Sequence, residues 1–270
     1  MSRHVTEPQP PDPAFATTST RLPAASPNVP RSASAFLAIM AGLVVIKLLV
    51  ERFTPNDFAS PSQAHVFAWW FIAALTAVGL IGVWFASRTG FPETWDPAIP
   101  VRDRVWIPAL VGLILGAIAL AVDAGTGWTA LAAAQMHMKT IHIAFPGSLL
   151  IYPGGAVIVN VIYYLMLIPP LTWLFSWVPA LLARDRARRT TVTIENAFIV
   201  AALLAALIEP LTQDLGLPGH PGIMAAVFTS DLALNLALVT TFRRAGFGST
   251  VVLRVVFYLV WHIARGVLPA

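Results

Sequence analysis

Long apolar runs alternate with short polar segments along most of this chain. Seven runs are nearly free of charge, at about residues 34–50, 66–86, 105–122, 149–180, 196–212, 222–241 and 249–268. As an α-helix rising 1.5 Å per residue, each run can cross the ~30 Å hydrocarbon core of a bilayer, given some tilt and snorkelling of flanking residues. The pattern predicts an all-α, polytopic integral membrane protein with about seven transmembrane helices.

The fourth run is too long for one straight span. We expect the Pro153-Gly154-Gly155 segment to break its start and the Pro169-Pro170 pair to kink its later half. Two connections are also long. Residues 87–104 are expected to form an interfacial loop, and residues 123–148 an amphipathic or re-entrant segment on the opposite side of the membrane.

Residues 1–33 differ in composition from the rest of the chain. They are rich in Pro, Ser, Thr and Ala and have few large apolar side chains. Such a segment buries too little apolar surface to offset the entropy of ordering, so we expect a disordered cytoplasmic tail followed by a membrane domain over 34–270.

The basic residues indicate the orientation of the helices. With the N-terminus inside, 12 of the 17 Lys and Arg residues fall in the inner segments, as the positive-inside rule requires. These residues are Arg3, Arg21, Arg31, Arg88, Arg102, Arg104, Arg184, Arg186, Arg188, Arg189, Arg243 and Arg244. Lys47, Arg52, Lys139 and Arg265 fall outside, and Arg254 lies within the seventh run. This bias supports seven spans with the N-terminus inside and the C-terminus outside.

Composition agrees with a membrane protein and excludes several classes. The chain is 57% hydrophobic and 11% charged, against about 25% charged residues in soluble domains. Its net charge of +4 sits at the ends of apolar runs and not on one face, so we expect lipid and no nucleic acid as its partner. The absence of cysteine excludes thiolate metal sites and a cysteine nucleophile. Ala and Arg enrichment suggests a bacterial source, which predicts a multi-pass protein of the bacterial inner membrane.

Polar residues inside the runs are the candidates for function, because a charge in the bilayer needs a partner or a cavity. They concentrate in the last four runs. We expect Glu209 to pair with His262, and Asp231 or Asn235 to pair with Arg254 at a second depth. The same pairs can serve only to hold helices together. The intramembrane polar set is Asn160, Tyr163, Tyr164, Glu209, Asp231, Asn235, Arg254, Tyr258 and His262.

His137 and His142 are the other histidines considered as metal ligands. Residues five apart on a helix do not share a face, so we interpret them as interfacial histidines. No metal site or cofactor is expected.

The segment over about 146–266 resembles a known family. It contains the runs PGSLLIYPGGAVIVNVIYYLMLIP, LLAALIEPLTQ and NLALVTTFRRAGFGSTVVLRVVFYLVWH. Their order and the FRRAGFGSTVVL link resemble the C-terminal core of the CPBP proteins, the CAAX-protease and bacteriocin-processing (Abi) intramembrane metalloproteases. The resemblance implies a helical membrane scaffold in which a Glu activates a metal-bound water and histidines hold the metal.

The catalytic motifs of that family are degenerate in this chain. Active members carry EExxxR, FxxxH and HxxxN. The corresponding positions hold Val159, Asn160 and Tyr164, then Ala205 and Glu209, then Arg254 and Tyr258; His262 is followed by Arg265 and Gly266, not Asn.

Three functions follow from these observations. The first is a CPBP-like protein without the protease site, serving as a membrane-embedded binding, scaffold or assembly component with a membrane-protein partner. The second is an intramembrane peptidase with an atypical site at Glu209 and His262. The third is a small-solute or proton-linked transporter that uses Glu209, Asp231 and Arg254.

Overall fold

The computed structural model describes residues 28–58, 60–138, 140–182, 189–212, 217 and 219–267, and within these ranges it contains helices and no strand. The helices are α1 (Val29–Phe53), α2 (Pro61–Val66), α3 (Trp69–Arg88), α4 (Ile107–Thr126), α5 (Trp128–Gln135), α6 (Ser148–Asn160), α7 (Ile168–Leu182), α8 (Arg189–Thr212), α9 (Pro221–Ala245), α10 (Phe247–Tyr258) and α11 (Ala264–Val267). π-Helical turns are η2 (Arg102–Trp106), η3 (Val161–Leu165) and η4 (Leu259–Ile263).

The helices have the length and composition of membrane spans. Six described segments can cross a bilayer: Val29–Phe53, Trp69–Arg88, Arg102–Thr126, Ser148–Trp177, Thr193–Thr212 and Pro221–Ala245. Large apolar side chains such as Leu110, Ile114 and Ile118 of α4 are about half exposed, as lipid-facing positions should be. The prediction of an all-α, multi-pass membrane protein is confirmed at this level. The seventh expected span forms a shorter apolar helix, Phe247–Ile263.

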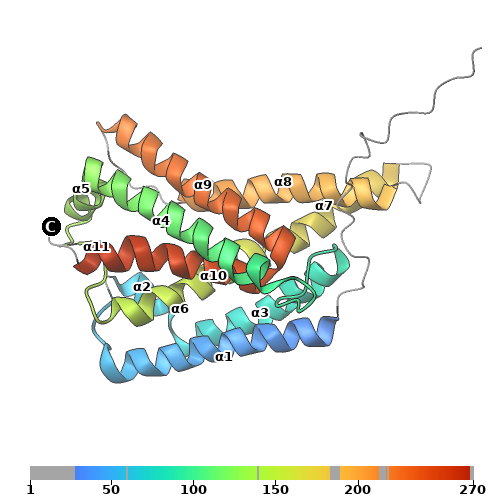
Figure 1. Cartoon of the computed structure of the whole chain (residues 1–270), viewed down its shortest axis with the longest axis horizontal. Coiled ribbons are helices and arrows are strands. Elements are labelled where there is room, and N and C mark those ends of the chain that lie inside the picture. The colour runs from blue at the N-terminus through green and yellow to red at the C-terminus, as the bar shows by residue number, and fades with distance from the viewer. Residues whose placement is uncertain are drawn as a thin grey trace, which may run out of the picture.

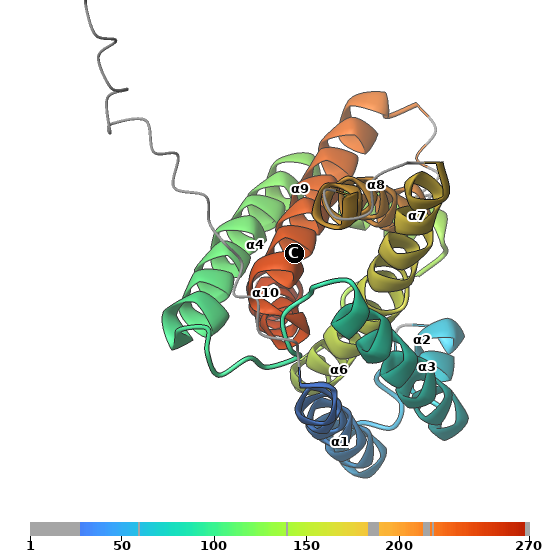
Figure 2. The same ribbon diagram turned by 90° about the vertical axis from the view of Figure 1, so that its right-hand side faces the viewer.

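Helix α10 lies in the middle of the arrangement. It packs against α4, α9 and α6, while α1 packs on α3 and α6, and α7 and α8 form a hairpin (Figures 1 and 2). In Figure 1 this hairpin reaches further than α10 toward the end of the bundle where α1 begins. That end is called the arginine-rich end here; its described basic residues are Arg31, Arg88, Arg102, Arg104, Arg243 and Arg244.

Helix α1 begins earlier than the apolar pattern indicates. Asn28 accepts a hydrogen bond from the backbone N–H of Arg31 at 3.1 Å, and Pro30 occupies the first turn, so the sequence carries a normal N-terminal cap. Arg31 also donates two hydrogen bonds to Glu93, at 2.6 and 2.8 Å, which holds the pKa of that carboxyl below its usual range. Residues 28–33 of the expected tail therefore belong to the helical domain. Residues 1–27 lie outside the described residues.

The long fourth run is one bent element. Helix α6 continues through Pro153, so the expected break at its start is not present. The interruption comes instead at η3 and the following turn, immediately before α7 and its Pro169-Pro170 pair. Proline at the first turn of a helix removes no needed hydrogen bond, and this explains why α7 starts there.

Close contact between α4 and α10 depends on glycine. A Cβ atom at Gly112 would lie 2.4 Å from the backbone oxygen of Leu253, and one at Gly116 would lie 3.0 Å from the backbone oxygen of Phe257. Small residues at such crossings let two backbones approach, which is the usual source of packing energy between helices in lipid.

We expect Gly112→Ala to destabilise the protein by about 1–3 kcal/mol, because the added methyl group meets backbone atoms that cannot move alone. Thermal unfolding of the purified protein in detergent measures the change. Gly42→Ala is the matched control, since nothing lies within 4 Å of its Cβ position. Equal melting temperatures for the two variants would contradict the packing argument.

Candidate functional site

Two of the π-helical turns contribute to the polar interior. Arg254 and Tyr258 lie one turn apart in α10, and His262 follows in η4. Tyr164 lies in η3, on the other side of the core. A π turn accommodates an extra residue in a helix and occurs frequently at functional sites. Two of the polar side chains, Tyr164 and His262, therefore lie where the helices depart from regular geometry.

The centre of this interior is the pair formed by Arg254 and Glu209. Arg254 is fully buried, and Glu209 is 5% exposed. Nη1 of Arg254 donates to Oε1 of Glu209 at 2.6 Å, and Nη2 donates to Oε2 at 2.7 Å. This two-point geometry is the strongest form of a carboxylate–guanidinium contact. It neutralises a permanent charge that would otherwise be very costly in the bilayer.

Three further side chains contact the two terminal nitrogens of Arg254, while its buried Nε has no hydrogen-bond partner among the described residues. Its Nη2 lies 3.1 Å from the hydroxyl of Tyr164 and 3.2 Å from Oδ1 of Asn235, and its Nη1 lies 3.3 Å from the hydroxyl of Tyr258. The Tyr164 hydroxyl in turn donates to Asn235. We call these five residues the Arg254 cluster: Tyr164, Glu209, Asn235, Arg254 and Tyr258.

Three other members of the predicted intramembrane polar set lie outside the Arg254 cluster: Asp231, Asn160 and Tyr163. Asp231 lines a small cavity together with Ser230, Trp128 and Trp261. Asn160 is fully buried, and neither atom of its amide has a hydrogen-bond partner within the described part of the chain. The Tyr163 hydroxyl lies 3.3 Å from that of Thr212, at an exposed position.

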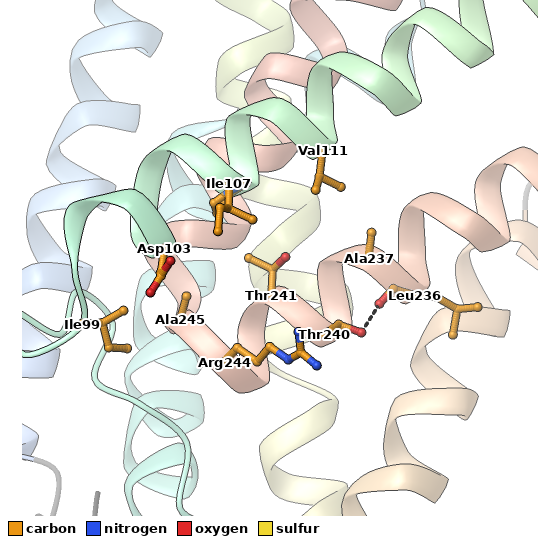
Figure 3. A pocket seen from close by; sticks show the side chains of 11 residues that line it. Ile99, Asp103, Ile107, Val111, Leu236, Ala237, Thr240, Thr241, Arg244 and Ala245 are labelled. Carbon is orange, nitrogen blue, oxygen red and sulfur yellow. Dashed lines mark hydrogen bonds between the residues drawn. The ribbon is translucent and has the colours of Figure 1, made fainter. Parts of the chain in front are cut away.

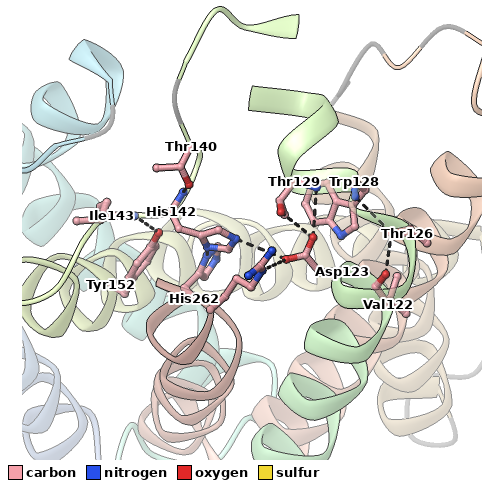
Figure 4. Close-up of polar contacts among 11 residues, drawn as sticks. Val122, Asp123, Thr126, Trp128, Thr129, Thr140, His142, Ile143, Tyr152 and His262 are labelled. Atoms are coloured by element: carbon pink, nitrogen blue, oxygen red, sulfur yellow. Dashed lines mark hydrogen bonds and ion pairs between the residues drawn. The ribbon is translucent and has the colours of Figure 1, made fainter. Parts of the chain in front are cut away.

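A second polar group forms around Asp123, which is fully buried at the end of α4 (Figure 4). Its Oδ1 accepts hydrogen bonds from the hydroxyl of Thr129 at 2.6 Å and from the N–H of the same residue at 3.3 Å. Its Oδ2 accepts one from Nε of Arg265 at 3.1 Å and lies 3.8 Å from Nε2 of His142. The carboxylate is thus held by α5, the following loop and α11.

His142 connects this group to the last helix. Its Nδ1 lies 3.2 Å from Nδ1 of His262, so one ring can donate to the other when their tautomers differ. The His262 ring is stacked on Tyr152, with centroids 4.3 Å apart and planes 10° apart, and its centroid lies 4.9 Å from that of Tyr258. Titratable side chains are therefore in contact along the whole path from Asp123 to the Arg254 cluster.

The structure corrects the expected pairing of Glu209 with His262. Both carboxylate oxygens of Glu209 bind Arg254, and the neighbours of His262 are His142, Tyr152 and Tyr258. The predicted pairing assumed that every span begins at the same level of the membrane. Glu209 lies 20 residues into α8, whereas Arg254 lies seven residues into α10. Since these two residues meet, α8 is displaced along the bundle by roughly 20 Å relative to α10, as Figure 1 shows for the α7–α8 hairpin.

The sequence analysis missed the Asp123 group. Asp123 stands at the polar edge of an apolar run, as the first residue of the expected amphipathic or re-entrant segment over 123–148. His142 was assigned to the interface, yet its side chain is buried; His137, its supposed partner, is exposed with a positive φ of 54°. The sequence feature that could have indicated this group is the cluster of hydrogen-bonding residues between 123 and 129, where α4 ends and α5 begins.

The described residues contain no set of three His, Asp or Glu side chains placed to hold a metal ion. Comparison of the chain with protein-family models, with curated proteins and with solved structures finds no match.

We expect Glu209→Gln to destabilise the protein by about 3–5 kcal/mol, because it leaves the guanidinium of Arg254 buried without a counter-charge. Chemical unfolding in micelles measures the loss. The double variant Glu209→Leu/Arg254→Met should recover much of the stability, since it removes both charges. Glu51→Gln is the control and should change stability little, because the Glu51 side chain that pairs with Lys47 is 44% exposed. Wild-type stability of Glu209→Gln would show that Arg254 does not depend on this partner.

Proposed function

We propose that this chain is a membrane-embedded binding or scaffold protein that has a CPBP-like architecture and no proteolytic activity. The single observation that supports this most directly is the state of Glu209. Each oxygen of its carboxylate accepts a hydrogen bond from Arg254, at 2.6 and 2.7 Å, in a buried site. The carboxylate therefore acts as a structural counter-charge.

A peptidase of the type suggested by the resemblance needs different geometry. A glutamate must reach the proton of a metal-bound water, with histidines holding the metal beside it. Here the guanidinium of Arg254 covers Glu209 and would repel a cation, while His262 faces His142 and Tyr152. These contacts favour the scaffold over the atypical peptidase.

A proton-linked transporter is the second candidate. The observation that favours it is the contact path that runs from Tyr258 and His262 of the last helix to His142 and then to Asp123 of α4. Histidine exchanges protons near neutral pH, and chains of such groups carry protons through membrane proteins.

Metal analysis separates the scaffold from the peptidase. After exposure to zinc and removal of free metal, we expect the purified chain to retain far less than one zinc per molecule, and His262→Gln to give the same value. Tagged protein extracted in mild detergent after cross-linking in its own membrane should carry a stoichiometric membrane-protein partner. A chain without such a partner that binds about one zinc, lost in His262→Gln, would overturn the proposal.

Proton flux separates the scaffold from the transporter. Liposomes containing the protein should take up protons no faster than empty liposomes when a pH gradient is applied, as reported by an enclosed pH-sensitive dye. A flux that disappears in His262→Gln but persists in His65→Gln would favour transport instead. His65 is a suitable control because its ring is exposed and lies 2.9 Å from the carbonyl of Pro61 in its own helix.

A further inference from the structure

A groove lies between α4 and α9 at the arginine-rich end of the bundle (Figure 3). Its volume is about 590 Å³, within the range of small-molecule sites in proteins. The walls come from the beginning of α4 and the end of α9, whose side chains face one another across the groove. Its principal lining residues are Ile107, Val111, Leu236, Thr240, Thr241 and Arg244. None of them belongs to the Arg254 cluster or to the Asp123 group.

The lining changes from polar to apolar with depth. On α9, Arg244 and the two threonines lie near the end of the helix, and Leu236 lies eight residues, or roughly 12 Å, further in. The opposite wall runs from Asp103 to Val111 over the same distance. Both walls thus present hydrogen-bonding groups at the bundle end and hydrocarbon further in, which is the profile of a phospholipid.

Arg244 is the cation available for a ligand. It is exposed, and it forms no hydrogen bond or ion pair with the residues that the structure describes. Its neighbour Arg243 already has partners: it donates to the carbonyls of Thr89 and Gly90 and to Glu195. The two adjacent arginines therefore differ in role: Arg243 holds the loop after α3, and Arg244 faces the groove.

The local charge favours an anion. Among the described residues that line the groove, Asp103 is the one acidic residue, and it lies 3.5 Å from Nε of Arg102, so its charge is matched. The unpaired charge of Arg244 then leaves an excess of positive charge at the groove mouth.

Exposed tryptophans place the mouth at the level of lipid headgroups. Trp106 is 68% exposed, and Trp95 lies beneath the guanidinium of Arg104 at 5.1 Å. Tryptophan is enriched at this level of a membrane because its ring is apolar and its N–H is polar. The groove therefore opens at the boundary between hydrocarbon and water.

We infer that the groove between α4 and α9 binds one anionic glycerophospholipid. Its phosphate contacts Arg244 and the hydroxyl of Thr241, and one acyl chain lies along Ile107, Val111 and Leu236. Basic pockets between transmembrane helices are known to take lipid headgroups of this charge. The site is separate from the proposed scaffold function and stands or falls independently of it.

Native mass spectrometry of the full chain, titrated with phosphatidylglycerol or phosphatidylcholine, tests the inference. We expect one phosphatidylglycerol to bind in preference to phosphatidylcholine, and Arg244→Gln to weaken it about fivefold, the factor that corresponds to roughly 1 kcal/mol for one arginine near a charged membrane surface. Val111→Trp should abolish the single site by filling the groove.

Arg88→Gln is the matched control, since Arg88 is exposed at the same end of the bundle but stacks on Trp84 outside the groove. It should leave the binding unchanged. Equal binding of the two lipids, or equal losses in Arg88→Gln and Arg244→Gln, would overturn the inference and indicate charge attraction alone.

A second copy of the chain is the competing occupant. Because the chain has no cysteine, Thr241→Cys provides a unique thiol in the groove. Accessibility of this thiol to a maleimide, reduced by phosphatidylglycerol, supports the lipid. Disulfide-linked dimers that form in the membrane irrespective of lipid would show that another copy covers the groove, and would overturn the inference.

Discussion

The burial of a guanidinium group governs the interior of this protein. Arginine stays protonated in any protein environment, so Arg254 cannot escape the cost of burial by losing its charge. An isolated cation of this kind costs at least ~2.5–3.5 kcal/mol in the middle of a transmembrane helix. The chain meets the requirement with acceptors from η3, α8, α9 and α10. The buried charge is stable only when all of these elements supply their acceptors. It therefore determines which helices pack next to one another.

The second polar group works at the end of the bundle in a different way. Asp123 is bound by groups from the neighbouring α5 and the following loop and by Arg265 of α11, which lies far away in the sequence. This carboxylate fixes the connections on one side of the membrane, whereas Arg254 fixes the helices within it. His262 lies between the two groups and touches both through His142 and Tyr258.

Much of the fold is readable from hydrophobic pattern alone. Uninterrupted apolar runs predict the helices, because lipid leaves the backbone no other partner for its hydrogen bonds. The spacing of Arg254 and Tyr258 also predicts a shared face, and the expected contact of Asn235 with Arg254 is present. Position along the bundle axis is not readable in this way. The displacement of α8 depends on how side chains of different helices pack, and for this reason Glu209 meets Arg254 and not His262.

Local exceptions to regular geometry are also hidden from the pattern. The run that contains Asp123 ends in a polar segment, and nothing in its spacing distinguishes a solvent-exposed carboxylate from a buried one. Likewise, Gly112 is one of several small residues in an apolar run, and nothing in the sequence pattern predicts its contact with Leu253. Such features emerge only when two helices are placed together.

The π turn η4 has a consequence for how tightly the length of the last helix is constrained. One additional residue in a turn rotates everything that follows by about 100° relative to a regular helix. Arg254 and Tyr258 precede η4 and face the Glu209 carboxylate, while Arg265 follows it and faces Asp123 on another helix. The single extra residue therefore changes the direction in which the following side chains point. As a result, one helix contacts two carboxylates that lie on different sides of it. Losing one residue from Leu259–Ile263 would keep the hydrophobic pattern almost intact and yet turn Arg265 away from its partner. Substitution of one apolar residue for another should therefore be tolerated here far better than the deletion or insertion of a residue.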